Sequence, residues 1–173
     1  AARRRGAAGA ARTGSAALGR GRAGGGPSGP GAGSQRMRGV GNKNVTEEQL
    51  MTTAERVFAR GWDGMKLYFM IGLPTEEESD VREIVRVGKR ARDVGKKVRK
   101  ESNQGGPPKV TVSVSTHVPK PHTPLQRCAM DREASVLMKQ GWLTEAVRGR
   151  GVSRRLHNPR AGWPVRLGPL ADR

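Results

Sequence analysis

The chain has 173 residues, of which 34% are hydrophobic and 3% aromatic, and its formal net charge is +18. This length suits one domain rather than two, and the low apolar fraction excludes a single compact core spanning the whole chain. The single cysteine, Cys128, excludes both an internal disulfide framework and a cysteine-based metal cage. No secretory leader pattern is visible, and no apolar run approaches the ~20 residues that a membrane span needs. We therefore expect a cytoplasmic protein with no membrane partner.

Low-complexity sequence and excess positive charge occur at both ends of the chain. Residues 1–32 are chiefly Gly, Ala, Arg, Pro and Ser, a composition that predicts a disordered tail. Within them, Gly19–Gly24 fits the GxGxxG pattern by letter, but no strand precedes it and no helix follows, so dinucleotide binding is not predicted there. Residues 136–173 are predicted to form an irregular or disordered basic tail. One folded domain is left, over residues 33–135.

The first regular elements follow residue 45. Thr46 and Gln49 match a capping box, and the apolar spacing behind them predicts a helix over 46–60. The nearly continuous apolar run Met65–Ile71 predicts a parallel strand that is buried on both faces. A tight Gly-Leu-Pro turn follows this strand.

A second helix and a second strand come next. Thr75 with Glu78 matches another capping box, and the periodicity predicts a helix over 76–95 whose basic run, 86–100, forms a solvated face. Residues 101–108 are a loop by composition. Lys109–Thr116 alternates valines with Ser and Thr, which predicts a strand. Asp131–Gln140 has weak helical character, and no period continues beyond it.

This alternation predicts an α/β fold with parallel strands joined by helical crossovers. A complete (β/α) barrel needs about 30 residues for each βα unit. The predicted domain therefore holds about three units of a partial (β/α) barrel. Such a piece leaves open sheet edges and an uncovered face, so we expect the isolated chain to be only marginally stable.

Three sequence segments resemble the radical S-adenosylmethionine family, in the branch with an N-terminal cobalamin-binding-type domain. They are Gly33-Ser-Gln-Arg-Met37 with Asn42-Lys43, then Tyr68-Phe-Met-Ile-Gly-Leu-Pro-Thr-Glu76, and finally Pro119-Lys-Pro-His-Thr-Pro124. The resemblance covers about residues 30–135. It implies that the chain holds only the C-terminal half of that family's catalytic barrel.

The resemblance also implies a cofactor site. Ile71, Gly72, Leu73 and Pro74 would line the adenine pocket of S-adenosylmethionine, while Ser34 and Lys43 would contact its ribose or carboxylate. Gly31 stands where the family usually carries a glutamate.

Neither of two further reactive side chains is assigned a catalytic or metal role. His122 is interpreted as a structural hydrogen-bonding residue in a proline-rich turn. Cys128 is interpreted as a small buried residue.

The chemistry of the family needs a 4Fe–4S cluster held by three thiolates in a CxxxCxxC motif, which one cysteine does not supply. The sequence therefore predicts a fragment that is inactive alone and binds neither cluster nor cofactor by itself, with an unknown substrate. The alternative hypothesis is a small basic protein that binds nucleic acid through its Arg-rich tails.

Overall fold

The computed structural model describes residues 28–43, 45–103, 106–123, 125–148 and 151–158. These residues form four strands and four helices. In chain order they are β1 (Ser28–Gly31), α1 (Gln35–Val40), α2 (Glu47–Ala59), β2 (Gly64–Ile71), α3 (Glu78–Glu101), β3 (Lys109–Thr116), α4 (Glu133–Val147) and β4 (Ser153–Leu156).

The strands make one sheet in the order β1-β2-β3-β4, and each neighbouring pair is parallel. This confirms the predicted α/β class and its parallel strands. The sheet is not closed into a barrel. Among the described helices, none combines the length and the apolar character that crossing a membrane would require.

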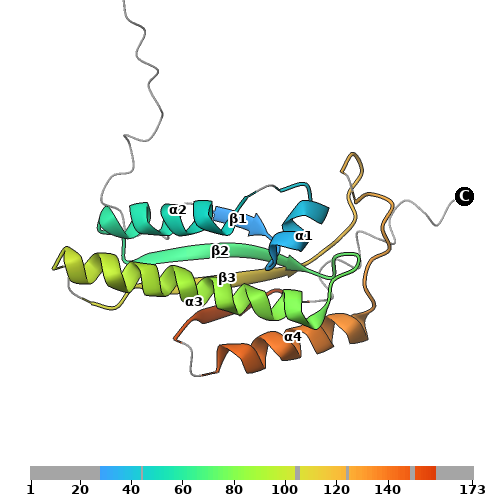
Figure 1. The fold of residues 1–173 in the computed structure, drawn as a ribbon. Coiled ribbons are helices and arrows are strands. Elements are labelled where there is room, and N and C mark those ends of the chain that lie inside the picture. The colour runs from blue at the N-terminus through green and yellow to red at the C-terminus, as the bar shows by residue number, and fades with distance from the viewer. Residues whose placement is uncertain (1–27, 44, 104–105, 124, 149–150, 159–173) are drawn as a thin grey trace, which may run out of the picture.

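The helices cover one face of this sheet. Because consecutive strands are neighbours and crossovers are right-handed, α2, α3 and α4 fall on the same side. In Figure 1, α3 crosses the sheet between α2 and α4. The core on this side takes alternate residues of β2 and β3 and the inner faces of the helices, including Met65, Leu67, Phe69, Ile71, Val110, Val112, Val114, Phe58, Val81, Ile84, Val85 and Ala91.

Two glycines let α3 approach its neighbours closely. A Cβ on Gly88 would lie 2.8 Å from Cγ1 of Val112 on β3. A Cβ on Gly95 would lie 2.6 Å from two ring atoms of Phe58 on α2. The central helix therefore contacts both sheet and helix through positions that hold no side chain.

The helix starts were only partly predicted. Thr46 caps α2 in a capping box with Gln49, as expected. The predicted cap at Thr75 is wrong, because α3 begins at Glu78 with Glu77 as its N-cap, in a box with Asp80. Thr75 lies in the preceding turn with a φ of 61°.

The predicted boundaries of the folded domain also need correction. Residues 28–31 form β1 and belong to the sheet, whereas the sequence placed them in the N-terminal tail. α3 runs to Glu101 rather than ending near 95. The weak helix predicted over Asp131–Gln140 is part of α4, which continues to Val147, and β4 follows it within residues 136–173, predicted to be an irregular or disordered tail. The rest of both predicted tails, 1–27 and 159–173, lies outside the described residues.

The second face of the sheet carries no helix among the described residues, although Ser113 of β3 is only 1% exposed there. Here β2 presents Lys66, Tyr68 and Met70, and Tyr68 is 40% exposed, so the prediction that this strand is buried on both faces is wrong. The partners of these residues on β3 are Thr111, Ser113 and Ser115. We call this surface the open face. In a closed barrel the face opposite the helices would line the interior.

Candidate functional site

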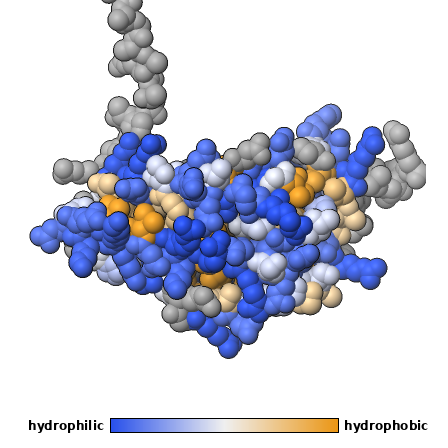
Figure 2. Space-filling model, in the orientation of Figure 1, coloured by the Kyte–Doolittle hydropathy of each residue, from blue (hydrophilic) through white to orange (hydrophobic). Residues whose placement is uncertain are grey.

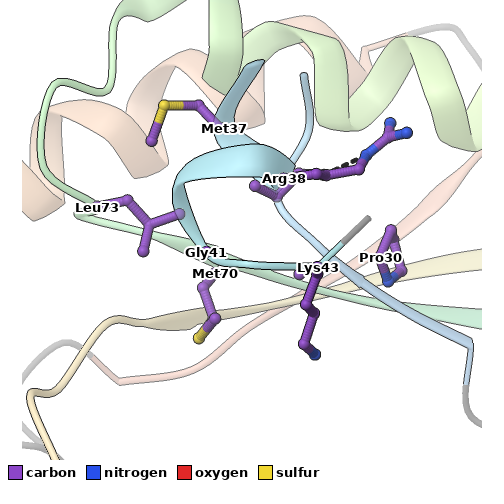
Figure 3. A pocket seen from close by; sticks show the side chains of 9 residues that line it. Pro30, Met37, Arg38, Gly41, Lys43, Met70 and Leu73 are labelled. Carbon is purple, nitrogen blue, oxygen red and sulfur yellow. Dashed lines mark hydrogen bonds between the residues drawn. The ribbon is translucent and has the colours of Figure 1, made fainter. Parts of the chain in front are cut away.

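A small pocket lies where the carboxyl ends of β1 and β2 meet (Figure 3). This is the edge at which parallel α/β sheets bind ligands. Its cavity volume is about 10 Å³, the space of a single water molecule. Its lining consists of Pro30, Gly31, Ala32, Met37, Arg38, Gly41, Lys43, Met70 and Leu73. Two of these residues are cationic and none is acidic.

Lys43 and Gly31 form one side of the pocket together. Gly31 has a φ of 83°, a conformation that favours glycine. A Cβ there would lie 2.9 Å from Cδ of Lys43, so the lysine stem occupies the space above the glycine. The Lys43 ammonium donates a hydrogen bond to the carbonyl of Gly29 at 3.4 Å. A glutamate at position 31 would therefore displace this lysine.

Ser34 caps α1 and does not line the pocket. Its hydroxyl accepts the Met37 N–H at 3.2 Å and donates to Asp80 Oδ1 at 2.5 Å. Arg36 forms an ion pair with the other oxygen of Asp80. Burial by itself raises the pKa of Asp80, but hydrogen bonds from Ser34, the Glu77 N–H and Arg36 lower it overall. Ser34 thus joins α1 to the start of α3.

The buried side chain of Arg38 stabilises the turn between β1 and α1. Only 1% of this residue is exposed. Its guanidinium donates to the carbonyl oxygens of Ala32, Gly33 and Val45 and to Gln35 Oε1, at 2.7–3.3 Å. Burial lowers the pKa of Arg38. The sequence did not single out this residue, because an isolated arginine in a basic segment carries no signal of burial.

The turn after β2 places one predicted residue in the pocket. Leu73 is 4% exposed and packs with Ala32 and Met37 in a small second cluster. Ile71 belongs to the main core. Gly72 and Pro74 shape the turn without lining the cavity, and the φ of Gly72 is 81°.

Glu76 fixes the shape of this turn. Its Oε2 accepts the Gly72 N–H at 2.7 Å and lies 2.9 Å from the ammonium of Lys139, which also lies 2.8 Å from Asp131 Oδ2. Burial raises the pKa of Glu76 despite the bonds from Lys139 and Gly72. Burial would lower the pKa of Lys139, but its bonds to Asp131 and Glu76 raise it overall. α4 thus supports the strand-end turn through a buried ion cluster.

His117 lies at the carboxyl end of β3, beside the same turn. Its backbone N–H donates to the carbonyl of Ile71 at 2.8 Å. The residue is 6% exposed, and its Nε2 has no hydrogen-bond partner in the described part of the chain. Burial lowers the pKa of His117, which favours the neutral imidazole.

The proline-rich segment lies at this end of the molecule but does not enter the pocket. Leu125 packs against the cluster of Ala32, Met37 and Leu73. His122 is exposed, with a φ of 61°, and its backbone N–H donates to Gln126 Oε1. Cys128 is partly exposed rather than buried as expected.

The pocket thus brings together two of the six predicted site residues, Lys43 and Leu73. The other four position the surrounding turns and α1. The chain does not fit a 4Fe–4S cluster, because it has one cysteine, and its described residues hold no group of three or more His, Cys, Asp or Glu suited to a metal.

Comparison with known proteins gives one relative. No family model matches the chain, and no solved structure matches it. The chain is similar to the uncharacterized protein MJ0966 of Methanocaldococcus jannaschii, with 31% identity over 123 residues. The match covers 71% of this chain and 24% of the relative. The chain therefore spans about a quarter of the length of the curated relative that it matches.

Proposed function

We propose that this chain is part of a radical S-adenosylmethionine barrel and that its strand-end pocket is one side of the cofactor site. One observation carries the proposal. Two positive-φ glycines, Gly31 and Gly72, end neighbouring parallel strands and bring an ammonium group and apolar side chains to one pocket. In the described part of the chain, helices cover only one face of the sheet, as in an arc cut from a barrel.

The pocket residues fit parts of the cofactor. Leu73 and Met70 offer apolar surface to the adenine, and the Lys43 ammonium suits its carboxylate. Ser34 is held by Asp80 and would act by keeping α1 in place. When bound, S-adenosylmethionine would supply a carbon–sulfur bond whose cleavage, with one electron from the cluster, gives methionine and an adenosyl radical.

The chain alone is proposed to be inactive. Its pocket volume of about 10 Å³ is too small for an adenine, so the site needs a further part of the barrel to complete it. The CxxxCxxC motif would also come from that part. A cytoplasmic location, where thiolates stay reduced, suits this proposal.

A hybrid protein tests the proposal. The segment of MJ0966 that matches this chain is replaced by this chain's residues, and the hybrid is reconstituted anaerobically with iron and sulfide. We expect the hybrid to release 5′-deoxyadenosine from S-adenosylmethionine under reducing conditions. Leu73→Asp should lower the rate by roughly 10²-fold, because a charge in the pocket displaces the adenine.

The matched control is Leu137→Asp, because Leu137 is 51% exposed on α4 and should leave the rate unchanged. A hybrid that holds a reducible cluster and still forms no 5′-deoxyadenosine would overturn the proposal.

Nucleic-acid binding is a second candidate function, favoured by the surface of α3. Figure 2 shows this side of the molecule as mostly hydrophilic. Arg86 and Arg90 pair with glutamates, whereas Lys89, Lys97 and Lys100 are exposed with no ion-pair partner in the described residues. A salt titration tests it: phosphate contacts predict that log affinity falls linearly with log salt. No binding to DNA or RNA at low salt would eliminate this function.

A further inference from the structure

The open face of the sheet carries a patch of unusual composition around Tyr68. Lys66 precedes Tyr68 by two residues on β2, and its ammonium lies over the tyrosine ring, 4.9 Å from the ring centre. The strand residues facing this side in β2 and β3 are Lys66, Tyr68, Met70, Thr111, Ser113 and Ser115, none of which is acidic. The patch is therefore cationic and holds one accessible aromatic ring.

Small residues flank Tyr68 on both neighbouring strands. On the β1 side, a Cβ on Gly29 would lie 3.9 Å from Cβ of Tyr68 and 3.8 Å from Nζ of Lys43. The glycine thus leaves open the space between the base of the Tyr68 side chain and a second ammonium. On the β3 side, Tyr68 is paired with Ser113, which is 1% exposed and whose hydroxyl lies 3.4 Å from Nε2 of His157. Tyr68 keeps 40% of its surface exposed in this setting.

The patch adjoins the strand-end pocket and shares Met70 with it. Lys43 and Met70 line the pocket, and in Figure 3 their side chains extend to the same side, away from Met37 and Arg38. Tyr68 and Lys66 do not line the pocket. A ligand on the patch would thus lie beside the proposed cofactor.

We propose that this patch binds a planar organic anion of the nucleotide type, with its ring against Tyr68 and its phosphate between Lys43 and Lys66. Stacking on an exposed aromatic ring tolerates any base, and two ammonium groups with no carboxylate among the facing strand residues of β2 and β3 favour a phosphate. The inference rests on the proposed function in one respect: it assigns this ligand as the substrate class of the barrel.

Binding of uridine monophosphate to the full chain tests the assignment. Calorimetry at low ionic strength is expected to detect binding that weakens as salt is added. Uridine, which lacks the charge, and ribose 5-phosphate, which lacks the ring, should each bind at least roughly tenfold more weakly. Equal binding of ribose 5-phosphate would overturn the role of the ring.

Variants locate the site. Tyr68→Ser should weaken binding roughly tenfold while Tyr68→Phe keeps it, and Lys66→Gln should weaken it about fivefold. Gly29→Val should abolish binding by filling this space, because valine suits a strand and its Cβ would meet its neighbours there at ordinary contact distances. Met138→Ser and Arg56→Gln, at exposed helical positions, are the matched controls.

A short oligothymidylate separates the two sources of a nucleotide. Binding that is lost with Tyr68→Ser and exceeds that of the mononucleotide would identify a single strand as the ligand. Comparable binding of the two would identify the free nucleotide. Binding of neither probe, or binding that Tyr68→Ser and Gly29→Val leave unchanged, would refute the assignment. That result would leave the cofactor proposal standing, because the hybrid assay does not involve this ligand.

Discussion

Several residues at the carboxyl edge of the sheet stabilise its turns, although the sequence around them does not indicate this role. Glu76 looks like an ordinary first-turn acid, yet its side chain is 2% exposed and holds the Gly72 turn. Arg38 stands in a basic stretch and is fully enclosed by carbonyl oxygens. In both cases burial is decided by residues distant in the chain, so local pattern does not predict it.

Removing the ammonium of Lys139, which pairs with Glu76, should be costly. Lys139→Met leaves the buried Glu76 carboxylate and Asp131 without their shared partner, and we expect a loss of about 2 kcal/mol in the free energy of unfolding. Urea denaturation measures this loss. If Lys139→Met combined with Glu76→Gln is no more stable than Lys139→Met alone, the ion cluster is not the cause.

His117 predicts a pH dependence of stability. Because burial lowers its pKa in the folded state, the unfolded chain binds the proton more readily. The stability contribution is thus present above the unfolded pKa of about 6.5 and is lost as the pH falls below it. His117→Phe should flatten this part of the curve of unfolding free energy against pH. An unchanged slope in the variant would contradict the assignment.

At the scale of elements, alanine substitutions at two helical glycines should have opposite effects on stability, because only one of these glycines is packed against a neighbouring helix. Gly95 faces the Phe58 ring at a distance too short for a Cβ, whereas a Cβ on Gly141 in α4 would meet nothing within 4 Å. Gly141→Ala should raise the unfolding free energy by up to about 1 kcal/mol through helix propensity. Gly95→Ala should lower it by about 1 kcal/mol, because overpacking outweighs that gain.

Thermal melts followed by circular dichroism compare the two variants with the parent chain. Equal stabilisation by both substitutions would mean that α2 and α3 do not pack as described.

The elements with strong periodicity were predictable, and those decided by tertiary contacts were not. The capping box at Thr46 and the alternating valines of 109–116 specify α2 and β3 locally. β1 contains Gly29, Pro30 and Gly31, a composition typical of a disordered tail. It forms a strand because it pairs with β2. Likewise the basic strand β4 forms only beside β3.

The same division applies to the site. The resemblance of short sequence motifs singled out Leu73 and Lys43, and both residues line the pocket. Glu76, Arg38 and His117 were missed, because their importance follows from burial rather than from spacing.

At the scale of the whole molecule, the described sheet has two edges, β1 and β4, and one open face. Exposed Arg154 and Arg155 place charge on the β4 edge, which opposes pairing with another chain. Replacing both with threonine should therefore raise the aggregation rate measured by light scattering. The control, Lys89→Thr and Lys97→Thr on α3, removes the same charge away from the edge. Equal aggregation of the two double variants would assign the effect to net charge.

The claim that this sheet is an arc of a cofactor-binding barrel is tested most directly on the longer relative. Purified MJ0966, reconstituted anaerobically with iron and sulfide and then reduced, is examined by electron paramagnetic resonance with and without S-adenosylmethionine. We expect the signal of a reduced 4Fe–4S cluster whose shape changes when the cofactor is added. A relative that assembles no cluster, or whose cluster signal is indifferent to S-adenosylmethionine, would contradict the claim.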